Sequence, residues 1–331
     1  MKSNVRILLL LAWGMAVLVS CGKPKPADKT LVAAPFSQDS AYSYIRQQVD
    51  FGARVPGSLS HERCARWLVE TLGRFDARVE IEQGSLPNYE GKQQPIVNIV
   101  AHFGNRTSAN GKLRKKLLLC AHYDSRPWAD QEEDYERRFT PVMGANDGAS
   151  GVGVLLEVAR QLGLMEPDKR PNVDIVLFDC EDMGTPEFFT GKQREDTWCL
   201  GSQLWAERHK NEASQYSYGI LLDMVGAPDA TFPKEYFSMQ YASEYVTQVW
   251  DVAMKLGYGS YFRQEGCMPI TDDHYYINRI AAIPCIDIIH YTPQNETGFA
   301  HYWHTTTDDM RNIARETLAA VGTTVMTVVN N

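Results

Sequence analysis

The 331-residue sequence predicts an α/β domain with a mainly parallel sheet that helices cover on both faces. Segments with strand character alternate along the chain with segments that have helical spacing of apolar residues. Several strand segments, such as 173–179, are apolar nearly throughout. Strands of this kind are typical of parallel sheets, which are buried on both faces.

The elements follow from the periodicity of apolar residues. Helices are predicted over 40–48, 60–72, 148–162, 199–208 and 242–255. Strands are predicted over 78–82, 96–103, 117–121, 173–179, 220–224 and 285–289. A closing helix is expected to begin at Asp308, with Asp309 in its first turn, where a negative charge is favourable.

Composition supports a globular domain and excludes one class of partner. The chain is 44% hydrophobic and 22% charged, which suffices for a core of ordinary size. The formal net charge of −8 gives no electrostatic footprint for nucleic acid, so no nucleic-acid partner is expected. No internal repeat is visible.

The N-terminus differs from the rest of the chain. Lys2 and Arg6 precede an apolar run over 7–19, which is too short to span a bilayer and predicts a signal peptide over 1–20. Its end resembles a bacterial lipoprotein cleavage box, so Cys21 is expected to carry lipid and to hold the protein on the periplasmic side of a membrane, inner or outer. The alternative is an ordinary signal peptide that happens to contain a cysteine. A flexible tether is predicted over 21–38, and the domain over 39–331.

Six further cysteines show no zinc-finger spacing. In an oxidising compartment a disulfide is permitted, and Cys180 with Cys199 is the first candidate pair. The alternative is that most of the six are buried free thiols.

Six groups of polar residues follow predicted strands or occupy loops, at 121–126, 144–151, 178–184, 221–226, 271–274 and 302–309. In open α/β sheets, sites form beyond the carboxyl ends of the strands, so these groups are expected to meet in one site. The adjacent carboxylates Glu181 and Asp182 would repel each other unless a cation or a proton separates them. They are therefore interpreted as one metal ligand and one general base and acid.

Each group alone also has a structural interpretation. His122 could be a structural histidine instead of a ligand oriented by the carboxylate of Asp124. Asp147 could cap the helix that follows it, and Asp273 could cap another. The pair at 181–182 could form a solvated acidic turn. Asp223, at the end of a buried strand, needs a metal or a hydrogen bond.

From the segment 51–58 to the closing helix, the sequence resembles the zinc aminopeptidases and the glutaminyl cyclases that share their fold. The resemblance implies a single domain with a mixed, mostly parallel sheet between helices. The aminopeptidase pattern implies two zinc ions, whose ligands fall on His122, Asp147, Asp182, Asp223 and His304. Asp182 departs from that pattern, which usually has Glu.

The cyclase pattern implies one zinc ion per chain, held by Asp147, Asp182 and His304. Two details favour it: the run Asp272-Asp273-His274 resembles a cyclase motif, and Trp303 precedes His304 as the cyclase aromatic wall does. A long insert through 197–202 is similar to the bacterial cyclases. Phe188, Phe189 and Trp198 are the candidates in that region for a further aromatic wall.

The cyclase resemblance implies a peptide or secreted protein with N-terminal Gln as substrate, pyroglutamate as product and ammonia as leaving group. It assigns Glu181 as the proton shuttle, Asp223 and Asp272 as a pair sharing a proton, and Trp303 as a substrate-binding wall. Two alternatives stay open: a dizinc aminopeptidase, and a non-catalytic lipid-anchored binding domain. A monomer is expected.

Overall fold

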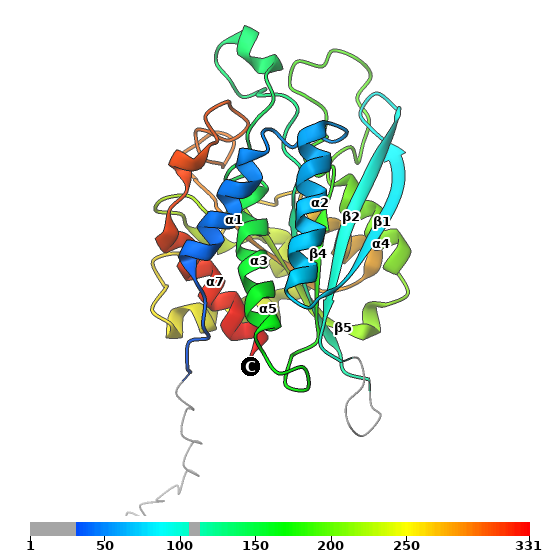
Figure 1. Ribbon diagram of the computed structural model, residues 1–331. Helices are drawn as coiled ribbons and strands as arrows, with labels where there is room; N and C mark the ends of the chain where they lie inside the picture. The colour runs from blue at the N-terminus through cyan, green and yellow to red at the C-terminus, as the bar shows by residue number, and fades with distance from the viewer. Residues whose placement is uncertain (1–30, 106–112) are drawn as a thin grey trace, which may run out of the picture. The chain divides into compact units, whose positions relative to one another are not determined.

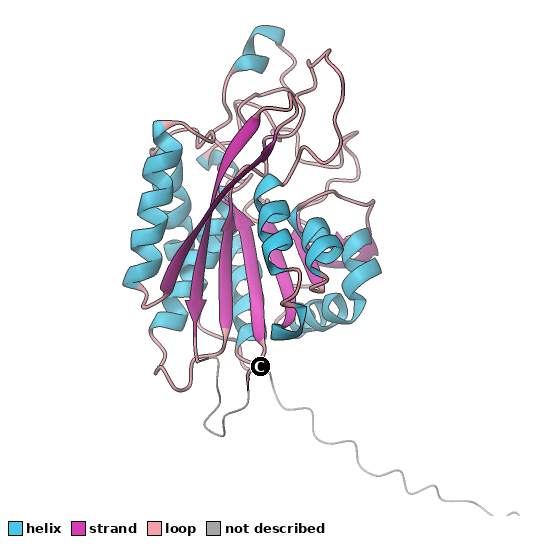
Figure 2. Cartoon of the chain, turned by 90° about the vertical axis from the view of Figure 1, so that its right-hand side faces the viewer, coloured by secondary structure: helices cyan, strands magenta, loops and turns pink. Residues whose placement is uncertain are grey.

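The structure is a computed structural model that describes residues 31–105 and 113–331. The predicted signal peptide and Cys21 lie outside the described residues. The central sheet has six strands: β1 Arg78–Pro87, β2 Gln93–Phe103, β3 Lys116–His122, β4 Val173–Phe178, β5 Tyr216–Asp223 and β8 Cys285–Ile289. Their spatial order is β1-β2-β4-β3-β5-β8. Figure 2 shows the strands in magenta with helices beside them.

The sheet is mixed and mostly parallel, as predicted. The pairs β4/β3, β3/β5 and β5/β8 are parallel, while β2 is antiparallel to both β1 and β4. A short turn joins β1 to β2, in which the N–H of Asn88 donates to the carbonyl of Lys92. Only antiparallel neighbours can be joined so briefly, since parallel strands need a crossover segment.

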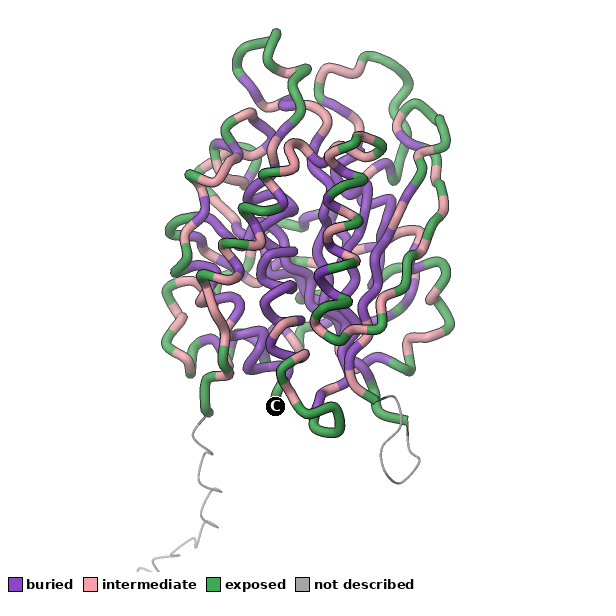
Figure 3. The backbone as a smooth tube through the Cα atoms, in the orientation of Figure 1, coloured by how far each residue is buried: buried purple, intermediate pink, exposed green. Residues whose placement is uncertain are grey.

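Helices cover both faces of the sheet (Figures 1 and 2). They are α1 Gln38–Asp50, α2 Leu59–Arg74, α3 Ala149–Gly163, α4 Leu200–His209, α5 Tyr236–Lys255, α6 Asp273–Tyr276 and α7 Arg315–Val329. Neighbouring residues of β3 belong to different cores: Leu119 is in the core that includes residues of α1, α2, α3, α5 and α7, and Cys120 is in the core that includes residues of α4. The central strands and α3 are the most completely buried elements (Figure 3).

A second, two-stranded parallel sheet was not predicted. It pairs β6 Phe232–Lys234 with β7 Phe262–Gly266. Three residues are too few for periodicity to reveal β6, and four of the five residues of β7 are exposed. The short 3₁₀ turns Tyr135–Phe139, Ala213–Gln215 and Met310–Asn312 and the π-helical turn Ile277–Ala281 were not predicted either.

The prediction that the closing helix begins at Asp308 is wrong, because α7 begins at Arg315. Asp309 caps the 3₁₀ turn Met310–Asn312 by accepting from the N–H of Arg311. Asp308 is fully buried, and its two carboxylate oxygens accept from the N–H groups of Asn146 and Asp147 at 2.9 and 3.0 Å. A long-range contact therefore uses a residue that the local pattern assigned to a helix start.

The described end of the predicted tether is packed on the domain. The N–H of Ala34 donates to the hydroxyl of Thr327, and the N–H of Ser37 donates to the carboxylate of Glu157. The ring of Phe36 lies against Gly322 of α7, where a Cβ would meet it at 2.0 Å. Residues 21–30 of the tether lie outside the described residues. Within the two described ranges, no helix combines the length and the apolar character needed to cross a membrane.

Candidate active site

The carboxyl ends of the central parallel strands carry the candidate site. His122 is the last residue of β3, Asp223 is the last residue of β5, and Glu181 and Asp182 follow β4. Because β3, β4 and β5 are parallel neighbours, these side chains meet at one edge of the sheet. The sequence prediction of a single composite site is therefore confirmed in its geometry.

Asp147, Asp182 and His304 each offer one ligand atom, and these atoms lie within 4.8 Å of one another. The Nε2 atom of His304 is 3.0 Å from Oδ1 of Asp182 and 3.5 Å from Oδ2 of Asp147. Oδ2 of Asp147 and Oδ2 of Asp182 are buried and lack hydrogen-bond partners in the described parts of the chain. Two carboxylates, each with a buried oxygen that lacks a hydrogen bond, and one imidazole form a ligand set that fits a zinc ion.

Asp147 does not cap α3. The N-cap is Gly148, with no side-chain hydrogen bond to the helix, and the carboxylate of Asp147 points instead to His122 and His304. Gly148 has a φ of +89°, and a Cβ there would lie 2.7 Å from the carbonyl oxygen of Asp124. The small residues of this loop thus bring the backbone close to β3 and leave the carboxylate of Asp147 free to bind metal.

The turn that holds Glu181 and Asp182 is buried, so the interpretation as a solvated acidic turn is wrong. The side chain of Asp182 is 2% exposed. The carboxylate of Asp124 accepts from the N–H groups of Glu181 and Asp182 at 3.1 and 3.2 Å. The predicted contact of Asp124 with Nδ1 of His122 is longer, at 3.5 Å. Asp124 therefore holds the acidic turn as well as facing His122.

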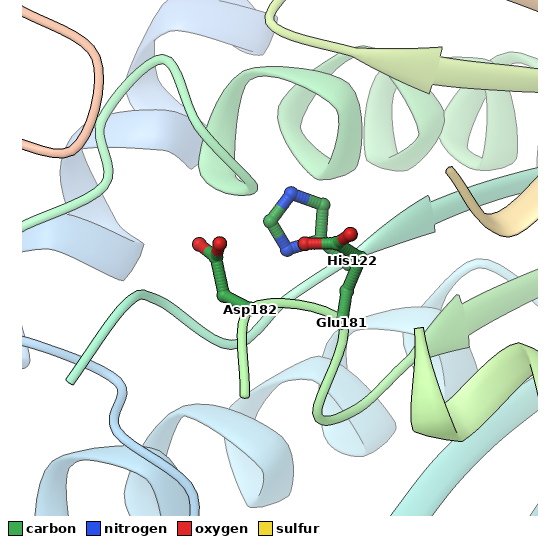
Figure 4. A group of neighbouring side chains, drawn as sticks. All are labelled: His122, Glu181 and Asp182. Carbon is green, nitrogen blue, oxygen red and sulfur yellow. The ribbon is translucent and has the colours of Figure 1, made fainter. Parts of the chain in front are cut away.

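A second candidate ligand set shares Asp147 with the first. The Nε2 atom of His122 lies 3.1 Å from Oδ1 of Asp147 and 3.2 Å from Oδ1 of Asp223. Burial lowers the pKa of His122, but its bonds to Asp124, Asp147 and Asp223 outweigh burial and raise that pKa well above its usual value. Figure 4 shows the imidazole of His122 beside the carboxylates of Glu181 and Asp182. All five positions of the two-zinc pattern are thus brought together.

Asp272 lies beside this second set and caps α6, with its carboxylate accepting from the N–H of Asp273. Its Oδ2 is buried and has no partner within the described residues, so no hydrogen bond joins it to Asp223. Burial, together with the charge of Asp272, raises the pKa of Asp223 to about 7, against the lowering effect of the bond from His122. The shared proton expected between Asp223 and Asp272 stays a prediction.

Glu181 is 9% exposed and faces the cavity. Burial, followed by the charge of Asp182, raises the pKa of Glu181 well above its usual value. The thiol of Cys199 donates to its Oε1 at 3.2 Å. The thiol of Cys180 donates elsewhere, to the carbonyl oxygen of Pro95. Both cysteines are free, so the candidate disulfide is absent between these two described residues and the free-thiol alternative holds.

A cavity of about 150 Å³ opens over the candidate ligands and Glu181. Its apolar wall is formed by Trp198, Met224, Ile270, Ile289, Phe299 and Trp303. The ring of Trp303 stacks on His304 at 3.7 Å, and the ring of Trp198 lies nearly parallel to His304 at 5.9 Å. Phe188 and Phe189 pack instead against Trp128 and Tyr89. Of the three aromatic candidates, Trp198 is therefore the one that lines the cavity.

Sequence reasoning missed the residues that support the candidate ligands. Asp130 lies 3.5 Å from Nδ1 of His304 and forms a buried bidentate ion pair with Arg126. Arg126 also donates to the carbonyl oxygen of Asp182, and its guanidinium carbon lies 4.4 Å from the ring centre of Trp198. No spacing in the sequence links Asp130 to a histidine 174 positions away.

A mixed sheet between helices, with two histidines and three aspartates at its carboxyl edge, is an architecture shared with a solved Zn-dependent exopeptidase and with solved glutaminyl cyclases. The model of "Peptidase family M28" matches residues 98–329, and the chain belongs to this family. A solved glutaminyl cyclase from Tannerella forsythia is 47% identical, with a TM-score of 0.84 over 90% of this chain and 99% of that one.

Two further relatives represent the two activities suggested by the sequence. A solved Zn-dependent exopeptidase from Parabacteroides distasonis is 46% identical, with a TM-score of 0.85 over 91% of this chain and 100% of that one. The glutaminyl-peptide cyclotransferase of Bos taurus is 25% identical over 80% of this chain and 74% of its own length. The family and its zinc-dependent members therefore support zinc as the metal of this site.

Proposed function

We propose that the protein is a glutaminyl-peptide cyclotransferase, which converts N-terminal Gln of peptides or proteins to pyroglutamate with release of ammonia. The observation that carries this proposal is a small cavity with Trp198 and Trp303 in its wall, which the candidate ligands and Glu181 also line. A cavity of about 150 Å³ has room for little more than one side chain with its amine. The similarity to solved bacterial glutaminyl cyclases supports the same activity.

The chemistry requires one tethered nucleophile and one proton carrier. The free α-amine of Gln attacks the side-chain amide carbon, a new C–N bond forms, and the original amide C–N bond breaks to release ammonia. Glu181 would take the proton from the attacking amine and deliver it to the departing nitrogen. Its burial suits this role, because burial raises the pKa of the Glu181 carboxyl and makes it a stronger base than an ordinary carboxylate.

The chain's other groups would hold the substrate and exclude water. Asp147, Asp182 and His304 would hold one zinc ion, which supplies a Lewis acid for the amide oxygen when bound. Trp303 would pack against the substrate side chain, and Asp223 with Asp272 would bind the amine or the departing ammonia. One ion per chain is proposed because Asp272, Trp303 and the presence of Asp182 instead of Glu follow the cyclase pattern rather than the two-zinc pattern.

The second candidate is a dizinc aminopeptidase. The observation that favours it is the set His122, Asp147 and Asp223, whose ligand atoms lie within 4.8 Å of one another. The similarity to the Zn-dependent exopeptidase from Parabacteroides distasonis agrees with hydrolysis. In that activity a water molecule rather than the substrate amine would be the nucleophile.

A paired assay separates the two activities. Purified protein is incubated with Gln-Ala and Leu-Ala peptides, and ammonia and free amino acids are measured. Ammonia release from the Gln peptide without free amino acid is expected. Free Leu from the second peptide would overturn the cyclase proposal, and two tightly held zinc ions per chain would overturn the count of one.

Location and assembly are part of the proposal. Lipid on Cys21 would anchor the enzyme on the periplasmic side of a bacterial membrane, as a monomer that acts on peptides or secreted proteins. Mass spectrometry of the protein isolated from membranes should find acyl chains on Cys21. A Cys21→Ser protein that still partitions with membranes would contradict the anchor.

A further inference from the structure

We propose that the thiol of Cys199 is a positioning residue for Glu181, and that it leaves Oε2 of Glu181 as the oxygen that faces the substrate. The inference rests on the proposed proton-carrying role of Glu181. The Sγ atom of Cys199 lies 3.2 Å from Oε1 of Glu181, and Cys199 is fully buried. A thiol that is buried away from water can donate its S–H only to an acceptor within the protein, and this hydrogen bond provides one.

The two oxygens of Glu181 have different surroundings. Oε1 accepts from Cys199, while Oε2 has no hydrogen-bond partner among the described residues and is not a buried atom. Glu181 itself lines the cavity, so its accessible oxygen is the one available to a bound amine. The thiol therefore fixes the rotation of the carboxylate and selects which oxygen exchanges protons.

The backbone contact between the two segments does not depend on the thiol. The N–H of Cys199 donates to the carbonyl oxygen of Glu181 at 2.9 Å, and the N–H of Leu200 donates to that of Cys180 at 3.1 Å. At Gly201 a Cβ would lie 2.2 Å from the carbonyl oxygen of Asp179, so the start of α4 is packed tightly against the turn. Removal of the thiol would leave these main-chain bonds in place and free only the carboxylate.

Cys180 provides a matched control within the same turn. Both cysteines are fully buried and both have left-handed backbone, with φ of 57° at Cys180 and 55° at Cys199. The thiol of Cys180 also donates one hydrogen bond, but to the carbonyl oxygen of Pro95. Substitution of Cys180 thus removes the same chemical group from the same kind of position, without touching Glu181.

The test measures ammonia release from a Gln-Ala peptide by the full-length protein and by four variants, Cys199→Ala, Cys199→Ser, Cys180→Ala and Cys180→Ser. Cys199→Ala should lower kcat about tenfold, the effect of one lost hydrogen bond, with KM and bound zinc unchanged. Cys199→Ser keeps a donor and should restore kcat to within about threefold of wild type. Both Cys180 variants should keep kcat within about twofold, because their lost bond does not touch Glu181.

Three results would overturn the inference. Wild-type kcat in Cys199→Ala would show that the thiol does not position Glu181. An equal loss in Cys180→Ala would show that the turn responds to any lost thiol. A Cys199→Ser protein as slow as Cys199→Ala would contradict the role of the donor, and this comparison holds even if the alanine variant is poorly folded. Wild-type protein that releases no ammonia would instead refute the proposed function on which the inference rests.

Discussion

The buried carboxylate of Asp130 is expected to support zinc binding through His304, and Asp130→Asn tests this. Asp130 is 2% exposed, lies 3.5 Å from Nδ1 of His304, and pairs with the buried Arg126. Burial alone would raise the pKa of Asp130, but its contacts with His304 and Arg126 lower that pKa below its usual range. The carboxylate is therefore charged at neutral pH and able to orient the imidazole.

Two separate losses are expected from Asp130→Asn. Removing one partner of a buried ion pair leaves Arg126 uncompensated and should lower the free energy of unfolding by about 3 kcal/mol. Loss of the carboxylate behind a ligating histidine should weaken zinc binding by about 10- to 100-fold. Zinc affinity is measured by competition with a chelator of known affinity, and stability by urea unfolding of the zinc-free protein.

The control variant is Asp174→Asn, which breaks a similar buried pair away from the site. Asp174 is 2% exposed and pairs with Lys116, which is 5% exposed, and with His102. Asp174→Asn should also cost about 3 kcal/mol of stability, while zinc affinity stays within about threefold of wild type. Unchanged zinc affinity in Asp130→Asn, or an equal loss in both variants, would refute the support of His304 by Asp130.

Three further outcomes are expected. Glu181→Gln should lower kcat by about 10²- to 10⁴-fold with zinc content unchanged, measured by ammonia release and metal analysis; retained activity would remove Glu181 from its role. Burial raises the pKa of Asp174, but His102 and Lys116 outweigh burial and lower it to about 2. Because its pKa is depressed in the folded state, Asp174 contributes about 2 kcal/mol to the free energy of unfolding at pH values above its unfolded pKa of about 4. This contribution is lost as the pH falls toward 2. Acid titration of zinc-free wild type and Asp174→Asn should therefore show a stability difference that shrinks over that window, and a constant difference would contradict the assignment. Removal of zinc with a chelator should lower the free energy of unfolding by about 4 kcal/mol, relative to protein with zinc at 1,000 times its Kd. The loss is expected because the buried oxygens of Asp147 and Asp182 would no longer bind a cation. Equal unfolding curves with and without the chelator would argue against a metal at these oxygens.

Local periodicity predicted the fold because its main elements are long enough to show a pattern. The apolar run at 173–179 appears as β4, and the spacing over 148–162 appears as α3. The elements that were missed or misplaced are short or depend on distant contacts. Asp308 illustrates the second case, since its partners Asn146 and Asp147 lie more than 160 residues away. Nothing in the residues around Asp308 distinguishes a helix start from an anchor for a distant loop.

The candidate site was predictable at the level of its ligands but not of their supports. Polar groups at strand ends are visible in the sequence, because the residues before them form apolar strands. The carboxylates that hold those groups in place occur in loops without periodicity. Asp124, Asp130 and Asp308 each accept hydrogen bonds from the backbone or from a basic side chain, and each contacts a candidate ligand or the turn that carries one. Such contacts exist only once the chain has folded.

Asp308 differs from the candidate ligands Asp147 and Asp182 in how its buried carboxylate oxygens are satisfied. Each of the carboxylate oxygens of Asp308 accepts from a backbone N–H, so both oxygens are satisfied by the protein itself. Asp147 and Asp182 each keep one buried oxygen without a hydrogen bond in the described chain, which would be costly in a folded protein that had nothing to bind there. The supporting acids fix the loops, and the open oxygens converge with His304. Zinc binding is therefore expected to depend on residues that never touch the metal, and Asp130→Asn probes that dependence directly.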